Sequence, residues 1–270
     1  MIDPNVFDQL EERQGWMIPG TSDCFRIPIE FSAAAFRFGH SMVRDTYEYN
    51  KCHPVVSLGE LLSRTGSQPG NAPLPAEWVI EWERFFYVGP SKFTVNFARK
   101  IDTKIAKGLH QLNQSTTAKF SVPSAPTRRR DKSSVPLVLE SHLPVRTLIR
   151  GARMGLPSGQ AVAKELHLPV LNAKDVANDP NREIIEKYGF DSDTPLWFYI
   201  LKEAEVLGDA NQPGKHLGPV GSRLVSDVIL GALAADPTSY VSAAPKDWRP
   251  QFEEMPGLPT LTAGGSNCSS

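Results

Sequence analysis

Helical periodicity limits the fold of this chain more than any other feature. Apolar residues recur at helical spacing in several stretches, while almost no stretch alternates as a β-strand does. At residues 29–44, Pro28 stands where a first-turn proline is tolerated and Glu30 suits the positive end of a helix. Further helices are predicted at residues 76–88, 101–112, 144–154, 158–166, 194–208 and 220–235, with Ser158 and Thr194 as N-caps. The predicted fold class is therefore mainly α.

Length and composition allow one large domain, or one domain with a small lobe. The chain has 270 residues, of which 40% are hydrophobic and 22% are charged, as in ordinary globular proteins. Glycine, proline and polar residues predict loops at residues 65–75 and 121–135, and the second carries the basic run Arg128–Arg130. Small polar residues predict a flexible tail at 251–270.

The charge balance argues against nucleic acid or an anionic membrane as a partner. Lys and Arg number 29 and Asp and Glu number 30, which gives a formal net charge of -1. No run of 18 apolar residues occurs, and the first residues lack the pattern of a secretory signal. The sequence as given is therefore expected to be soluble and cytoplasmic, although a signal encoded upstream would change that expectation.

The cysteines point away from a disulfide framework. Cys24, Cys52 and Cys268 are an odd number and show no CxxC spacing, which also argues against a structural zinc site. The sequence predicts free thiols.

His40 is the histidine whose neighbours suggest a ligand site. It follows Gly39, which removes a side chain beside the imidazole, and Arg37 lies one turn earlier on nearly the same face. An arginine can grip the carboxylates of an anionic cofactor bidentately. By spacing alone, a satisfied core histidine is the better explanation of His40.

Four ordered blocks resemble one known family. The string PIEFSAAAFRFGHSMVR (Pro28–Arg44) is similar to the proximal-histidine helix of the animal-type, or cyclooxygenase-like, haem peroxidases. The other blocks follow in the family's order and are WVIEWERFF (Trp78–Phe86), LIRGARMGLPSGQAVAKEL (Leu148–Leu166), and TPLWFYILKEAEVLG with LGPVGSRLVSDVILGALAADPTSY (Thr194–Gly208 and Leu217–Tyr240). The resemblance implies that residues 1–250 are the C-terminal portion of an irregular multi-helix haem peroxidase domain, incomplete at its N-terminal side.

The resemblance assigns roles to four residues. His40 would be the proximal ligand of the haem iron, and Arg37 and Arg150 would pair with the haem propionates. The family usually places an Asn three residues before the second arginine, where it accepts a hydrogen bond from the ligand histidine and makes it more electron-donating. Here that position is Thr147, whose hydroxyl either accepts the same bond or bonds its own helix backbone.

The distal catalytic residues of the family have no counterpart here. The family's distal histidine and catalytic arginine precede the proximal helix by a long stretch, and none of the other histidines matches that motif. Three functions stay open at this point. The chain is part of a peroxidase that uses hydrogen peroxide and a small organic or halide donor when a distal half completes it; or it binds haem without turnover; or it is a helical interaction module without haem.

Overall fold

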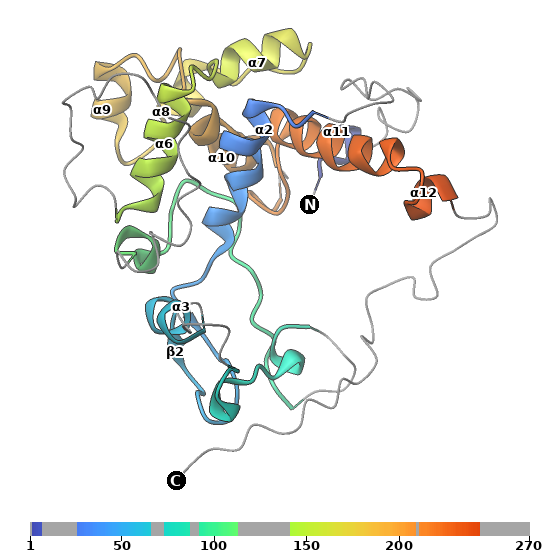
Figure 1. The fold of residues 1–270 in the computed structure, drawn as a ribbon. Coiled ribbons are helices and arrows are strands. Elements are labelled where there is room, and N and C mark those ends of the chain that lie inside the picture. Colours follow the sequence, from blue (N-terminus) through green and yellow to red (C-terminus); the bar gives the residue numbers. More distant parts are fainter. Residues whose placement is uncertain are drawn as a thin grey trace, which may run out of the picture. The chain divides into compact units, whose positions relative to one another are not determined.

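The computed structural model describes residues 2–6, 26–65, 73–86, 92–112, 141–208 and 211–243 (Figure 1). Over these ranges the protein is mainly helical, as predicted, and its strands are one short antiparallel pair, β1 (Thr46–Tyr47) with β2 (Val56–Ser57). The chain forms two compact units. The first comprises Met1–Met42, Lys100–Ile105 and Val145–Trp248, and the second comprises Val43–Arg99, Ala106–Pro144 and Arg249–Ser270. The loop at 121–135 and the tail at 251–270 lie outside the described residues.

The first unit is built around one helix that is buried on almost every side. This helix, α10 (Leu196–Leu207), packs against the 3₁₀ helix η1 (Ala35–Met42), α7 (Gly159–Glu165), α8 (Ala173–Ala177) and α11 (Pro219–Ala235). Because apolar residues surround it, it behaves as a core helix rather than a surface one. The other helices of the unit are α2 (Ile29–Ala33), α6 (Leu143–Arg153, from Val145 on), α9 (Arg182–Lys187) and α12 (Tyr240–Ala243).

The approach of α7 to α10 depends on a glycine. A Cβ atom added at Gly159 would lie 1.9 Å from Cγ of Tyr199, so no other residue fits there without a shift. Tyr199 is fully buried, and its hydroxyl accepts a hydrogen bond of 3.0 Å from the backbone N–H of Leu171. The tyrosine is therefore fixed at both ends, and the contact holds α10 against α7.

Three of the predicted helices are confirmed with small changes at their ends. The stretch at 144–154 forms α6 and turns at Gly155, whose φ of 66° suits glycine. The stretch at 158–166 forms α7, and the Ser158 hydroxyl accepts the N–H of Ala161 as the predicted N-cap. The stretch at 220–235 forms α11.

The helix predicted at 194–208 is confirmed as α10, but its predicted cap is wrong. The helix begins at Leu196 with Pro195 at the cap position, and no side chain caps it. The Thr194 hydroxyl instead donates to the backbone oxygen of Phe190 at 2.6 Å and accepts from the Gln160 amide at 2.7 Å. Thr194 thus ties α7 to the segment before α10.

The single helix predicted at 29–44 is wrong in its type. The chain forms α2, breaks at Ala34 (φ -130°, ψ -69°), and continues as the 3₁₀ helix η1. The side chain of Ser41 donates to the backbone oxygen of Phe38 three residues earlier, which suits the tighter helix. Over so short a run the apolar patterns of the two helix types are difficult to tell apart.

The helix predicted at 76–88 is also wrong. Two 3₁₀ turns, η3 (Ala76–Trp78) and η4 (Trp82–Arg84), are separated by an extended segment in the second unit. The side-chain amide of Asn50, fully buried, donates to the backbone oxygens of Glu77 and Val79, both at 2.8 Å. These long-range bonds take up backbone groups that a helix would use for itself, so they favour the extended form. Residues 87 and 88 lie outside the described part.

The helix predicted at 101–112 is likewise wrong, except for its end. Only η5 (Lys107–His110) forms there, and it lies in the second unit together with α3 (Leu58–Thr65), which the sequence did not predict. The start of the stretch belongs to the first unit, where the N–H of Ile101 donates to the backbone oxygen of Gly214 at 2.8 Å. That bond is made with a distant segment, so local periodicity does not reveal it.

The expectation of free thiols is wrong for Cys52 and for the cysteine to which it is bonded. Cys52 is disulfide-bonded, and its partner lies outside the described residues. Cysteine number alone therefore gave a poor guide, because an odd count leaves room for one pair and one free thiol.

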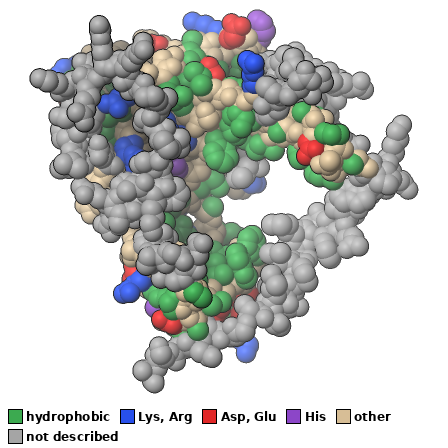
Figure 2. All heavy atoms as spheres, viewed as in Figure 1, with side chains coloured by type: hydrophobic (Ala, Val, Ile, Leu, Met, Phe, Trp, Pro, Cys, Tyr) green, Lys and Arg blue, Asp and Glu red, His purple; other side chains and the backbone are tan. Residues whose placement is uncertain are grey.

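The surface carries both charged and hydrophobic side chains, as Figure 2 shows for one face. Exposed hydrophobic side chains include Phe36 at 63% and Phe97 at 71%. In the part of the chain that the structure describes, no helix has the length and apolar character needed to cross a membrane.

Candidate functional site

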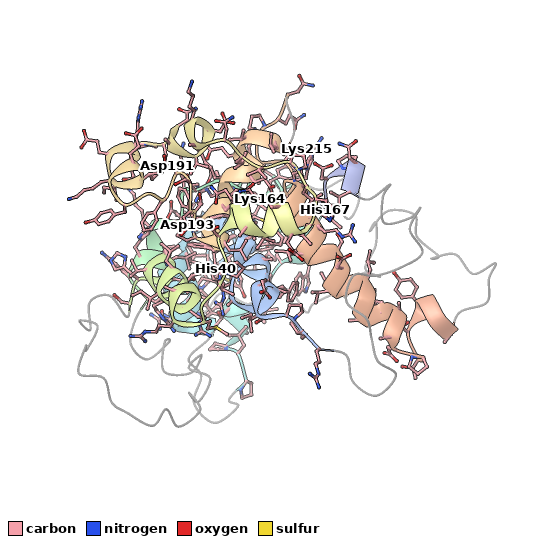
Figure 3. The ribbon with its side chains drawn as sticks, turned by 90° about the horizontal axis from the view of Figure 1, so that it is seen from above. His40, Lys164, His167, Asp191, Asp193 and Lys215 are labelled. Carbon is pink, nitrogen blue, oxygen red and sulfur yellow. The ribbon has the colours of Figure 1, made fainter. Side chains whose placement is uncertain are left out.

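The site predicted around His40 is built on η1 of the first unit. His40 and Arg37 are three residues apart, which is one turn of a 3₁₀ helix, so both side chains leave the same side of η1. Arg37 is anchored at its backbone, because the indole N–H of Trp197 donates to its oxygen at 3.0 Å. Figure 3 shows His40 among the side chains of the surrounding helices, whereas His167 and Lys215 are exposed.

The imidazole of His40 is largely buried and neutral. Burial lowers its pKa to about 4, and the positive charge of Arg37 adds to the effect. Its Nδ1 atom is buried and has no hydrogen-bond partner among the described residues. The ring stands edge-on to the indole of Trp197, with 6.1 Å between the ring centroids. A buried ring nitrogen without a partner is costly, and a bound ligand would remove that cost.

Positive charge gathers beside His40. The pKa of Arg37 is lowered by burial first, and then by the charges of Arg150 and Arg146, which both lie on α6. The fold thus brings Arg37 and Arg150 near each other although more than a hundred residues separate them in the sequence. Arginines that repel one another would be stabilised by an anion between them. Arg146 was missed by the sequence reasoning, but its place one helical turn before Arg150 is a signal that could have found it.

Thr147 is buried at 2% exposure, on the same helix as Arg150. Its side chain lies in the wall of a cavity of about 410 Å³, which His40, Arg37 and Arg150 do not line. Nδ1 of His40 makes no hydrogen bond to Thr147. The structure therefore places His40 and Arg37 on one side of η1, and it brings Arg150 close enough to lower the pKa of Arg37. Thr147 lies instead in the wall of a neighbouring cavity.

The residues around His40 suit haem in three respects. A neutral histidine with an unpartnered nitrogen is ready to bind a metal, and the arginines suit the carboxylates of the cofactor. A Cβ atom at Gly39 would meet nothing within 4 Å, so there is open space beside the histidine. Among the described residues no cluster of three or more His, Cys, Asp or Glu could hold a bare metal ion, but haem needs only one protein ligand.

Comparisons with known proteins find likeness among solved structures but not among family models or curated proteins. No family model and no curated protein matches the chain. Among solved structures the chain is similar to peroxidase A from Dictyostelium discoideum, with a TM-score of 0.47 and 18% sequence identity. The match covers 79% of this chain and 36% of that one, so the chain spans little more than a third of that peroxidase's length. A likeness at this level carries no statement about activity.

Proposed function

We propose that this chain supplies the proximal half of a haem site in a peroxidase of the animal type. His40 would be the iron ligand, and Arg37 and Arg150 would bind the haem propionates. One observation carries the proposal: a neutral histidine with a buried, unpartnered nitrogen lies beside arginines that come from two separate elements of the fold. The sequence resemblance, read independently, points to the same three residues.

Each residue has a separate task in this proposal. Haem, when bound, supplies the iron that reacts with hydrogen peroxide and withdraws electrons from a small organic or halide donor. His40 holds the cofactor and needs no deprotonation first, because its imidazole is already neutral at pH 7. The two guanidinium groups orient the cofactor through its carboxylates, and their planar shape allows two hydrogen bonds to each carboxylate. Trp197 positions Arg37 by binding its backbone oxygen.

The distal side of the site would come from residues outside these 270. Peroxide cleavage needs a base and a charge-stabilising donor, which together contribute on the order of 10⁴ to 10⁷ in rate. We assign neither role to a residue of this chain. The chain alone should therefore bind haem and show little turnover.

We infer the cellular compartment of the protein from the disulfide at Cys52, not from the lack of a signal pattern. Disulfides persist mainly in oxidising compartments and are rare in the cytosol. The bond at Cys52 therefore favours an oxidising environment over the cytoplasmic one that the sequence suggested.

Haemin titration tests the proposal. The absorption band of haemin is followed as wild-type chain, His40→Ala or His167→Asn is added, and His167 serves as the control because it is exposed and its φ of 55° is one that asparagine tolerates. We expect the wild type and His167→Asn to give the same saturable shift, and His40→Ala to lose it. Peroxide-driven oxidation of a phenol is measured in parallel. Equal shifts in all three proteins would remove His40 from the ligand role, and brisk turnover would place a distal base within this chain.

A further inference from the structure

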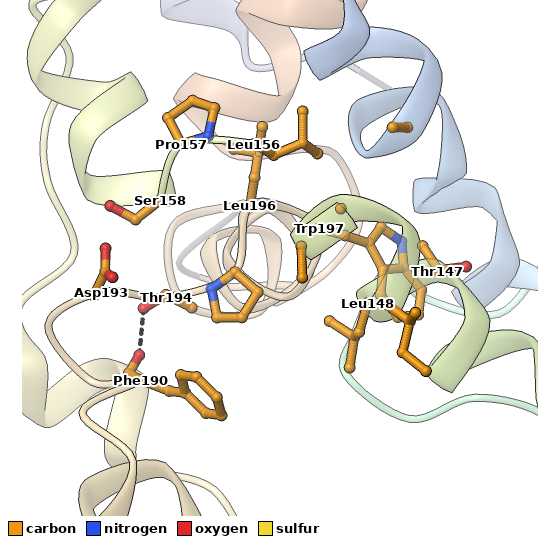
Figure 4. A pocket seen from close by; sticks show the side chains of 15 residues that line it. Thr147, Leu148, Leu156, Pro157, Ser158, Phe190, Asp193, Thr194, Leu196 and Trp197 are labelled. Carbon is orange, nitrogen blue, oxygen red and sulfur yellow. Dashed lines mark hydrogen bonds between the residues drawn. The ribbon is translucent and has the colours of Figure 1, made fainter. Parts of the chain in front are cut away.

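A second site lies in the cavity beside Thr147. The cavity has a volume of about 410 Å³, which is within the usual range of small-molecule sites. Its walls come from Ala33 of α2, from α6, and from the segments 156–158 and 190–197, all in the first unit. Leu148, Leu156, Leu196 and the rings of Phe190 and Trp197 make most of the wall apolar (Figure 4).

One lining residue of this cavity is charged. Asp193 is exposed at the cavity wall, and its carboxylate makes no hydrogen bond or ion pair within the part of the chain that the structure describes. The hydroxyl of Thr194 is already engaged, since it donates to Phe190 and accepts from Gln160. Ser158 accepts the N–H of Ala161 at 3.4 Å, which leaves the second lone pair of its hydroxyl oxygen to accept an N–H of a ligand. Figure 4 shows the Ser158 and Asp193 side chains at one end of the cavity and Trp197 at the other.

The chemistry of this cavity differs from that of the His40 site. The His40 site gathers positive charge, whereas the cavity has a single negatively charged side chain at one end and mostly apolar walls. An anionic ligand such as a fatty acid would meet the carboxylate of Asp193. A ligand with an apolar body and one cationic group would bury its apolar body against the walls and pair its cationic group with the Asp193 carboxylate.

We propose that this cavity binds a small monocyclic aromatic amine, with its ring between the apolar side chains and its ammonium group at Asp193. The aromatic rings of Phe190 and Trp197 favour an aromatic body over an aliphatic one, because ring pairs gain more than their buried area alone provides. The Ser158 hydroxyl and the Asp193 carboxylate both suit an N–H donor. This site needs neither haem nor His40, so it stands or falls separately from the proposed peroxidase function.

Calorimetric titration with three matched probes tests the assignment. 2-Phenylethylamine is cationic, 2-phenylethanol is its neutral analogue, and 3-phenylpropionate is anionic. We expect the amine to bind most tightly and the acid most weakly. Asp193→Asn should weaken binding of the amine by about fivefold to tenfold, since the ion pair is partly exposed, and leave the alcohol unchanged. Asp191→Asn is the matched control because Asp191 does not line this cavity, and it should change nothing.

A second variant keeps the proposal testable if the charge effect is small. Ala152 lines the cavity but is exposed on α6, so Ala152→Trp fills space there with little cost to the fold. We expect it to abolish binding of the amine and the alcohol while the haemin titration stays as in the wild type. Failure of the wild type to bind the amine, or binding that survives both Asp193→Asn and Ala152→Trp, would overturn the assignment.

Discussion

Glu203 makes the stability of this protein depend on pH in an unusual direction. Its side chain is fully buried on α10, and its carboxylate accepts the backbone N–H groups of Val220 and Gly221 at the start of α11, at 3.0 to 3.1 Å. Burial raises its pKa from 4.5 to about 8, although the two N–H groups act in the opposite direction; the nearby charge of Asp3 adds to the rise. The folded protein therefore keeps a proton on Glu203 at pH 7, while the unfolded chain has lost it.

The sign and size of the effect follow from this difference. Between pH 4.5 and pH 8 the folded state binds more protons than the unfolded state, so the free energy of unfolding falls as pH rises. A difference of one bound proton changes the free energy of unfolding by about 1.4 kcal/mol per pH unit. Between pH 4.5 and pH 7 the free energy of unfolding therefore falls by roughly 3 kcal/mol. Above pH 8 both the folded and the unfolded state have released this proton, so the loss of stability has reached its full size.

Urea unfolding of the wild type and Glu203→Gln at pH 5, 6, 7 and 7.5 measures this effect. Glutamine does not titrate, so the variant lacks this part of the pH dependence, although the loss of a hydrogen bond should lower its stability by about 1 kcal/mol at pH 5. We expect the two curves to approach or cross as pH rises, with a difference in slope of about 1 kcal/mol per pH unit. Exposed Glu186→Gln is the control. Parallel curves for the wild type and Glu203→Gln would refute a protonated Glu203 in the folded state.

Three further predictions concern packing, the cofactor and the disulfide. Gly159→Ala should lower the free energy of unfolding by about 3 kcal/mol or more because its Cβ would overlap Tyr199, while Gly59→Ala, in open space, should change it by less than about 1 kcal/mol; similar losses in urea unfolding would contradict this contrast. Arg150→Gln should weaken haemin binding about tenfold and leave the dimethyl ester of haemin unaffected, and an equal loss for both ligands would exclude a propionate contact. Alkylation of the unfolded, unreduced chain should modify one cysteine and that of the reduced chain three, as mass spectrometry can count; three without reductant would exclude the bond at Cys52.

The helices that the sequence predicted well are those whose boundaries are local. At α6 the left-handed Gly155 ends the helix, and at α7 the hydroxyl of Ser158 caps it, so the residues nearby contain the signal. The stretches at 76–88 and 101–112 failed because distant groups compete for their backbone: the amide of Asn50 in the first case and the oxygen of Gly214 in the second. These partners are distant in the sequence, so the periodicity of apolar residues within a stretch does not reveal them.

The candidate site could likewise be predicted only in part from the sequence. The relation between Arg37 and His40 is one helical turn and is visible in the sequence. The nearness of Arg150 came only from the family resemblance, and the fold brings it to Arg37 through the packing of separate elements. The unpartnered Nδ1 of His40 and the cavity beside Thr147 depend on side-chain placement around Trp197, which no spacing rule contains.

Chemical rescue of His40→Gly tests the central claim most directly. If His40 supplies the ligand, removing its side chain leaves space into which free imidazole fits, and imidazole then takes the ligand position. The absorption band of haemin is recorded with His40→Gly and with the control His167→Asn, each without imidazole and with imidazole added in steps. We predict that His40→Gly lacks the wild-type band and regains it saturably with imidazole, while His167→Asn shows it throughout. A wild-type band in His40→Gly before any imidazole is added would contradict the assignment of His40 as the ligand that holds the haem iron.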